Sequence, residues 1–178
     1  MVEQILRELP RDFRAPIAIC QHMAPGFTRG WAERLDSICR LSVREARYGD
    51  AFEAGTAYVA SGGKHMRVKR ENANVTVTLD VDFADSLHVP SIDILMSSIA
   101  QAYGSRALGV LLTGLGQDGA LGMLAVRRAG GHTITESEDS AVAYSMPGSA
   151  VEMGAAAEEV SASGMPQAII DRVEGILA

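Results

Sequence analysis

The sequence predicts one α/β domain with a mainly parallel sheet and an inserted antiparallel hairpin. Its 178 residues are enough for a single domain with a substantial core. Short apolar runs alternate with amphipathic stretches, the pattern of parallel βαβ units. In the middle of the chain, residues 65–70 and 75–79 both alternate and flank a turn at 71–74. That arrangement predicts the hairpin.

The part before the hairpin predicts two helices and three strands. Residues 3–9 are amphipathic, and Thr28 is placed to cap a helix that runs to about Arg40. The loop 22–27 between them holds a Pro-Gly pair, which favours a turn. The expected strands are 16–21, 41–46 and 58–61.

The part after the hairpin begins with an acidic loop (Asp80, Asp82, Asp85) and then returns to alternating helices and strands. Residues 107–113 are apolar through Leu112, as a buried parallel strand should be. Further strands are expected at 132–135 and 158–161, and helices at 91–103, 120–129 and 146–153. The closing helix has one apolar face, formed by Ile169, Ile170, Val173, Ile176 and Leu177.

Composition excludes several classes of protein. A net charge of −6 argues against nucleic acid as the main partner, and no apolar run approaches the roughly 18 residues of a membrane span. The charged N-terminus has no signal-peptide core. Cys20 and Cys39 have neither CxxC nor metal-ligand spacing. We therefore expect a cytoplasmic protein with free thiols and no metal or cofactor.

The charge is unevenly distributed along the chain. Residues 1–47 carry a net charge of +2, and the rest of the chain carries −8. The early arginines either favour an acidic protein surface or form a solvated helix face.

Two polar residues follow apolar strands, where ligands bind in open parallel sheets. His22 comes directly after residues 16–21, and Asp118 follows the strand 107–113 across a glycine-rich turn. A histidine held by a carboxylate can take a proton from a hydroxyl nucleophile, because the carboxylate fixes its tautomer and stabilises the imidazolium. Structural roles stay open, since His22 can be a hydrogen-bonding partner and Asp118 an N-cap.

The turn 114–119 also has two interpretations. Its backbone N–H groups can cradle a phosphate or stabilise an oxyanion, although it lacks the Walker lysine and the GxGxxG spacing. The other histidines, His65, His88 and His132, share no metal-ligand spacing with each other or with the cysteines.

Two longer motifs now make the chain recognisable. Gln21-His22-Met23-Ala24-Pro25-Gly26-Phe27-Thr28 and Leu112-Thr113-Gly114-Leu115-Gly116-Gln117-Asp118-Gly119-Ala120 occur in that order. With Pro90-Ser91-Ile92-Asp93 and Met146-Pro147, they resemble the catalytic domain of bacterial chemotaxis methylesterases (CheB) over nearly the whole chain.

The resemblance implies a doubly wound, mainly parallel sheet in a three-layer, Rossmann-like fold. It also implies a hydrolase of glutamate methyl esters on chemoreceptors, and many members of the family deamidate certain receptor glutamines as well. It implies that His22 is the general base, Asp118 its orienting carboxylate, and the Leu115 N–H an oxyanion donor. Met23, Pro25, Gly26 and Phe27 are expected to line the cleft where the cytoplasmic receptor helix docks, although Phe27 can also be a packing residue. Many family members also carry a receiver domain ahead of the catalytic domain, which these 178 residues do not include.

The family nucleophile is a serine in a Ser-x-Gly-Gly motif at the end of the first strand. Here Val2-Glu3-Gln4-Ile5-Leu6 matches the helix that follows that motif, so the motif would precede residue 2. Ser61, before Gly62-Gly63, and Cys20, on the same strand face as His22, are poor substitutes.

We expect these 178 residues alone to be inactive or nearly so as an esterase, and two neighbouring strands to lack a partner. A receptor- or partner-binding pseudoenzyme is the alternative. Another α/β hydrolase is disfavoured because no GxSxG motif occurs.

Overall fold

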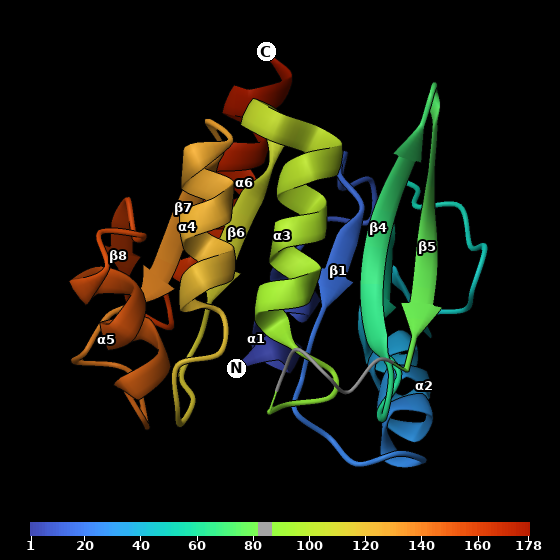
Figure 1. Ribbon diagram of the computed structural model, residues 1–178, viewed down its shortest axis with the longest axis horizontal. Helices are drawn as coiled ribbons and strands as arrows, with labels where there is room; N and C mark the ends of the chain where they lie inside the picture. The colour runs from blue at the N-terminus through green and yellow to red at the C-terminus, as the bar shows by residue number, and fades with distance from the viewer. Residues whose placement is uncertain (82–86) are drawn as a thin grey trace. The chain divides into compact units, whose positions relative to one another are not determined.

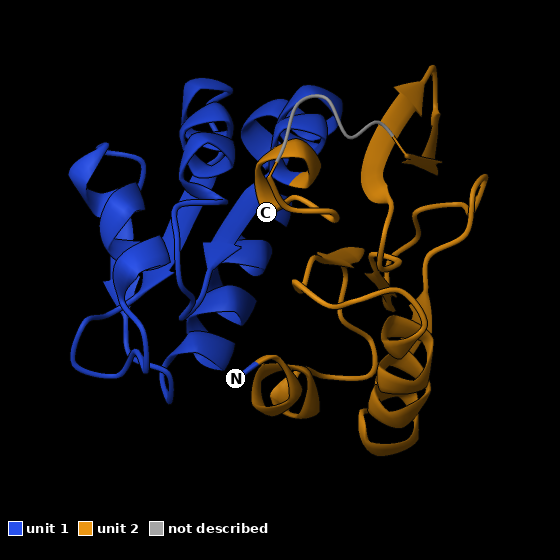
Figure 2. Ribbon diagram, turned by 60° about the horizontal axis from the view of Figure 1, so that its bottom comes forward, with its two compact units in different colours: residues 1, 96–178 blue, residues 2–95 orange. Residues whose placement is uncertain are grey.

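The protein is described here by a computed structural model that covers residues 1–81 and 87–178. Its contacts separate into two compact units, one of residues 2–95 and one of residues 96–178 with Met1 (Figure 2). Asp82 and Asp85 of the expected acidic loop lie outside the described residues. In the described part, no helix has both the length and the apolarity needed to cross a membrane.

The first unit is built on three parallel strands in the order β1-β3-β2 (Figure 1). These are β1 (Ile17–Ile19), β2 (Ser42–Glu45) and β3 (Thr56–Val59), accompanied by α1 (Val2–Glu8) and α2 (Phe27–Ile38). The middle strand is the most deeply buried, and Ala57, Tyr58 and Val59 are all 0% exposed. Within the described residues, β1 pairs with β3 alone, so its other edge has no neighbouring strand.

The predicted hairpin is confirmed. Strands β4 (His65–Glu71) and β5 (Asn74–Asp80) are antiparallel and pair His65 with Asp80 at their open end. Asn72 in the turn has φ 55°, a left-handed conformation that Asn tolerates better than most residues. The alternating pattern places Val68 and Val77 opposite each other on the buried face.

The second unit is built on three parallel strands in the order β6-β7-β8. They are β6 (Leu108–Leu111), β7 (His132–Glu136) and β8 (Glu158–Val160). The helices are α3 (Ile92–Tyr103), which begins in the first unit, α4 (Ala120–Arg128), α5 (Ser145–Glu152) and α6 (Met165–Leu177). Figure 1 shows α4 in front of β6 and β7 and α6 behind them, as in a doubly wound fold. In the described part, β6 pairs with β7 alone.

Close helix-to-strand packing in this unit depends on a glycine. A Cβ atom added to Gly131 would lie 2.6 Å from the carbonyl oxygen of Ala107 and 2.8 Å from Cγ1 of Val126. Both Ala107 and Val126 belong to a buried cluster with Ala100. The Gly130-Gly131 pair therefore ends α4 and also lets the chain pass directly against the core.

Charged side chains link the last strand to the last helix. Oε2 of Glu158 lies 2.9 Å from Nη2 of Arg172 and 3.2 Å from Nε2 of His132. Burial raises the pKa of Glu158, but hydrogen bonds from His132 and Arg172 outweigh this effect and leave the pKa below its ordinary value of 4.5.

The fold class and the order of elements agree with the sequence analysis, but the N-cap expected at Thr28 is wrong, and so is the alternative role of Asp118 as an N-cap. Gly26, with φ 89°, is the N-cap of α2, and the Thr28 hydroxyl instead donates to Oε1 of Glu45. Gly119, with φ 106°, is the N-cap of α4, so Asp118 precedes the cap. In both turns a glycine takes the left-handed conformation that starts the helix. The single-domain assignment of residues 1–178 stays a prediction.

Candidate active site

The loop after β1 carries His22 and packs closely on a second loop, residues 61–65. A Cβ atom on Gly62 would lie 2.6 Å from the Ala24 carbonyl oxygen, and one on Gly63 would lie 2.8 Å from Cγ of Pro25. The Gly62 N–H also donates to Oγ1 of Thr28 at 3.0 Å. The two glycines therefore bring the 61–65 loop against the backbone that follows His22.

His22 is half-buried, and its ring stacks on the ring of His88. The ring centroids are 4.4 Å apart and the ring planes are inclined by 16°. Sequence reasoning set His88 aside as part of an acidic loop and missed this contact. No local pattern signals it, because the two residues are far apart in the chain.

The four residues predicted to line a cleft beside His22 are all accessible at least in part. Met23 is half-buried, Pro25 and Gly26 are exposed, and the Phe27 side chain is 67% exposed at the start of α2. An aromatic ring so exposed contributes little to the core, which argues against a purely packing role for Phe27. Its role in a cleft stays a prediction.

The turn after β6 is fixed by hydrogen bonds to the start of α5 and the residues just before it. The Gly114 N–H donates to the Ala143 carbonyl at 2.9 Å, and the Gly116 N–H donates to Oγ of Ser145 at 3.0 Å. The Leu115 N–H lies between these two and donates to no residue that the structure describes. Leu115 is also 78% exposed. No described residue therefore engages the Leu115 amide, whereas a phosphate cradle would need the two amides already in use.

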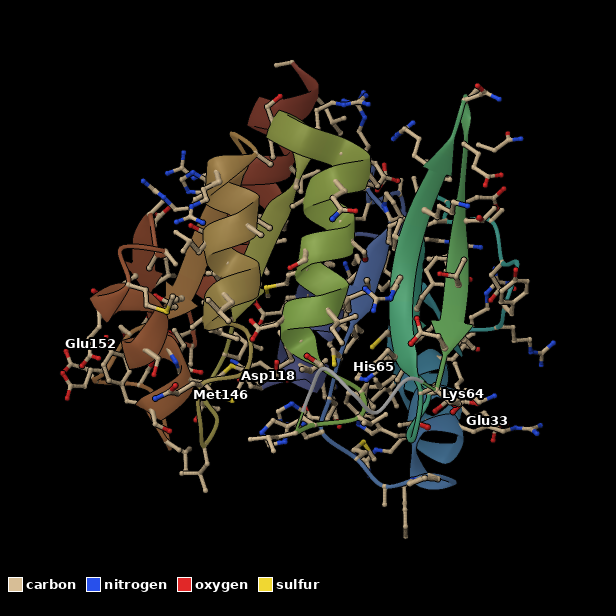
Figure 3. All side chains as sticks on the ribbon, viewed as in Figure 1. Glu33, Lys64, His65, Asp118, Met146 and Glu152 are labelled. Atoms are coloured by element: carbon tan, nitrogen blue, oxygen red, sulfur yellow. The ribbon has the colours of Figure 1, made fainter. Side chains whose placement is uncertain are left out.

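Asp118 lies in the same turn, just ahead of α4, and is only 8% exposed (Figure 3). Figure 3 also labels Met146 at the start of α5 in this unit. A Cβ atom on Gly114 would meet the side chain of Met146, which packs closely against the turn at this point. The turn is thus held on one side by hydrogen bonds and on the other by packing.

A buried glutamate that sequence reasoning did not single out supports this turn. Glu136 is 0% exposed at the end of β7, and its Oε2 accepts a hydrogen bond from the Thr113 N–H at 2.8 Å. Its Oε1 accepts one from Oγ of Ser140 at 3.3 Å. The Thr113 hydroxyl donates to the Ala143 carbonyl and accepts from the Ala143 N–H. The carboxylate therefore holds the start of the turn that bears Leu115 and Asp118.

The candidate residues divide between the two units. His22 and the four cleft residues belong to residues 2–95, and Leu115 and Asp118 belong to residues 96–178. The structure brings His22 together with His88, and it places Leu115 and Asp118 on one turn. The pairing of His22 with Asp118 stays a prediction.

The two weak candidates for a nucleophile are both half-buried. Cys20 directly follows β1, and the Ser61 carbonyl accepts the Lys64 N–H at 3.2 Å in the loop after β3. Over residues 1–81 and 87–178, no group of three or more His, Cys, Asp or Glu side chains is placed to hold a metal ion.

Known proteins match nearly the full length of this chain. The profile of the CheB methylesterase family matches residues 1–169. A protein-glutamate methylesterase/protein-glutamine glutaminase 2 of Nitratidesulfovibrio vulgaris is 45% identical over 170 residues, which cover 96% of this chain and 46% of that protein. A protein-glutamate methylesterase/protein-glutamine glutaminase of Chromohalobacter salexigens is 43% identical over 173 residues, covering 97% and 49%.

A solved structure matches equally well. The crystal structure of the Thermotoga maritima CheB methylesterase catalytic domain superposes with a TM-score of 0.92 and 36% identity, covering 96% of this chain and 90% of that chain. These matches define an α/β protein of the methylesterase catalytic-domain type. The chain belongs to the CheB methylesterase family. It spans about half the length of the curated relatives that it matches.

Proposed function

We propose that this chain is the catalytic part of a protein-glutamate methylesterase that acts in the cytoplasm on chemoreceptor helices. One observation carries the proposal: the Gly114 and Gly116 amides of this turn make hydrogen bonds, and the Leu115 amide between them makes none to the residues that the structure describes. An oxyanion hole needs such a preorganised donor aimed at developing charge. Asp118, buried on the same turn, is the orienting carboxylate.

The reaction would be acyl transfer in two steps. His22 takes the proton of a serine hydroxyl as its oxygen attacks the ester carbonyl, and the Leu115 N–H stabilises the oxyanion. The tetrahedral intermediate collapses, and methanol leaves with the proton held by His22. His22 then activates water, which hydrolyses the acyl-enzyme and restores the serine. Asp118 fixes the His22 tautomer and stabilises its charged form throughout.

The finer part of the proposal concerns the nucleophile. No Ser-x-Gly-Gly occurs within the 178 residues, so we expect them alone to be inactive or nearly so. In a serine protease, loss of the nucleophile lowers turnover about 10⁶-fold and leaves roughly 10³–10⁴-fold catalysis over water. We further propose that a receiver domain occurs in the full-length protein, as in many members of the family.

The first test uses the 178 residues with a receptor carrying labelled methyl esters. We expect methanol release no higher than that of the His22→Ala variant. Robust release that depends on His22 would contradict the inactivity of these residues and point to Ser61 or Cys20. The variants Ser61→Ala and Cys20→Ala then tell these two apart.

The second test extends the chain at its N-terminus by a strand that ends in Ser-x-Gly-Gly. We expect it to release methanol and to unfold at a higher temperature, because in the described part of the chain β1 and β6 each pair with a strand on one side alone and can each accept a further strand. The same strand with Ala in place of Ser is the matched control, which should gain stability without activity. A folded extended chain that binds receptor but releases no methanol would favour a receptor-binding pseudoenzyme.

A further inference from the structure

We infer that His88 is a positioning residue for His22, holding the plane of the His22 ring by stacking on it. The contact itself is independent of the chemistry, whereas its consequence for catalysis rests on the proposed role of His22 as general base. The inference concerns only the unit of residues 2–95, which contains both histidines.

The geometry is that of two stacked rings. The centroids are 4.4 Å apart, just below the roughly 4.5–7 Å of most aromatic pairs, and the planes differ by 16°. His22 lies in the loop between β1 and α2, and His88 lies in the segment between β5 and α3. Neither residue lies within a helix or strand. A ring-to-ring contact of this kind restricts rotation about the Cβ–Cγ bond, which is otherwise broad for histidine.

The segment that carries His88 is itself anchored. Just after it, the Val89 carbonyl accepts the Gly63 N–H at 3.4 Å, and Nδ1 of His65 accepts the Ser91 N–H at 3.3 Å. His65 lies at the start of β4 and is 0% exposed (Figure 3). Because Nδ1 accepts a hydrogen bond from the backbone, neutral His65 must carry its proton on Nε2. A buried side chain thus ties the His88 segment to the hairpin.

The same 61–65 loop holds the segment that carries His22. Gly62 and Gly63 pack against the backbone of Ala24 and the ring of Pro25, at distances that leave no room for a Cβ atom. The Gly62 N–H also binds Thr28, whose hydroxyl donates to Glu45 on β2. The 61–65 loop therefore contacts both of the segments that carry these histidines. Because both segments pack on the same loop, that loop sets the distance between the two rings.

This arrangement matters for a general base. Proton transfer requires the accepting nitrogen to lie within hydrogen-bond reach of the nucleophile, and preorganisation removes the cost of finding that orientation. A carboxylate at one ring nitrogen fixes the tautomer, but it leaves the ring free to tilt about that hydrogen bond. A stacked ring opposes that tilt. The carboxylate would thus fix the tautomer of His22, and His88 would fix the tilt of its ring.

The test uses nuclear magnetic resonance on the 178 residues as they are. The chain has four histidines, so it gives four imidazole Cε1–H signals, which His→Gln substitutions assign one by one. In the unsubstituted protein we expect a nuclear Overhauser effect between the His22 and His88 rings. We also expect an upfield displacement of the His22 signal by the neighbouring ring. A folded protein in which both are absent overturns the inference without any variant.

Two matched variants separate stacking from simple space filling. His88→Phe keeps a flat ring and should keep the His22 signal displaced, whereas His88→Leu keeps apolar bulk without a ring and should lose the displacement. The His132 signal, from the other unit, reports whether the fold persists and should not move. Equal His22 signals in the two variants, with His132 unchanged, would overturn the inference.

The chain extended with the Ser-x-Gly-Gly strand tests the catalytic consequence separately. We expect His88→Leu to lower kcat with little change in KM, and His88→Phe to recover most of the loss. If the rings stack but His22→Ala retains full activity, the proposed function fails and the stacking stands. If His22 is essential but the rings do not stack, the inference about His88 fails alone.

Discussion

The contact between the 61–65 loop and the His22 loop makes a sharp prediction for Gly62→Ala. The new Cβ atom would lie 2.6 Å from the Ala24 carbonyl oxygen, 2.8 Å from the Ala24 carbonyl carbon and 2.9 Å from the Met23 carbonyl oxygen. All three atoms belong to the backbone, so no side chain can rotate out of the way. Either the Met23–Ala24 backbone or the 61–65 loop must move by several tenths of an ångström.

The size of the effect follows from the cost of overpacking. Adding a methyl group to a site without room costs about 1–3 kcal/mol. In a chain of this size each kcal/mol lowers the unfolding temperature by about 2–4 °C, so Gly62→Ala should lower it by roughly 2–12 °C.

Gly30→Ala is the matched control. Gly30 lies within α2, and a Cβ atom there meets no atom within 4 Å. Alanine inside a helix is favoured over glycine by about 0.5–1 kcal/mol, so this variant should unfold about 1–4 °C higher than the unsubstituted chain.

Thermal unfolding followed by circular dichroism measures both effects. Because the strain of Gly62→Ala falls on the backbone after His22, the same variant should also move the His22 imidazole signal, and Gly30→Ala should not. A Gly62→Ala protein as stable as the unsubstituted chain, with an unmoved His22 signal, would refute the packing described here.

Three further predictions concern the second unit. Glu136→Ala should lower the free energy of unfolding by about 1–3 kcal/mol because it leaves the Thr113 N–H unpaired, whereas Glu136→Gln should lower it much less. Urea unfolding measures both variants, and equal losses would contradict the role of the Glu136 carboxylate as acceptor. The lowered pKa of Glu158 means that its ionised form contributes stability fully above pH 4.5 and loses it as the pH falls through the lowered value. The deficit of Glu158→Gln in thermal unfolding should therefore be constant above about pH 4.5 and shrink as the pH falls below it, and a deficit that does not shrink there would contradict it. The hydrogen bond from Tyr144 to Glu159 raises the pKa of Tyr144 to about 12, so Tyr144→Phe should remove an ultraviolet titration step near that pH, and an unchanged titration there would contradict the hydrogen bond.

Much of the fold could be predicted from the sequence because its determinants are local. Apolar runs such as residues 107–113 indicated buried parallel strands, and strand β6 lies within that range. Two alternating runs around a short turn were enough to place the hairpin. Strand ends were overestimated, since an apolar run continues beyond the last residue that pairs.

The helix starts were harder to predict because two residue types competed for the same position. Thr28 is a good N-cap by residue type, but Gly26 takes the left-handed conformation two residues earlier and starts the helix there. The Thr28 hydroxyl instead accepts a hydrogen bond from the Gly62 N–H and donates one to Glu45.

Contacts between distant segments could not be predicted at all. The stack of His22 on His88 depends on how the 61–65 loop gathers two segments, and the sequence shows only a histidine in an acidic stretch. Glu136 looked like any acidic residue at a strand end, and its burial depends on Thr113 and Ser140. The motifs did identify His22, Leu115 and Asp118 as candidates. That His22 and Asp118 act together in ester hydrolysis is the prediction that the next experiment tests.

The most direct measurement of the central claim is a double-mutant cycle on methanol release. The chain extended by a Ser-x-Gly-Gly strand is compared with its His22→Ala, Asp118→Asn and doubly substituted forms, using a methylated receptor. In serine proteases the corresponding Asp→Asn change lowers turnover about 10⁴-fold, and residues that act as a unit have non-additive effects. We predict a large loss in each single variant and almost no further loss in the double variant. Losses that multiply, or a His22→Ala variant that keeps its activity, would contradict the pairing of His22 with Asp118.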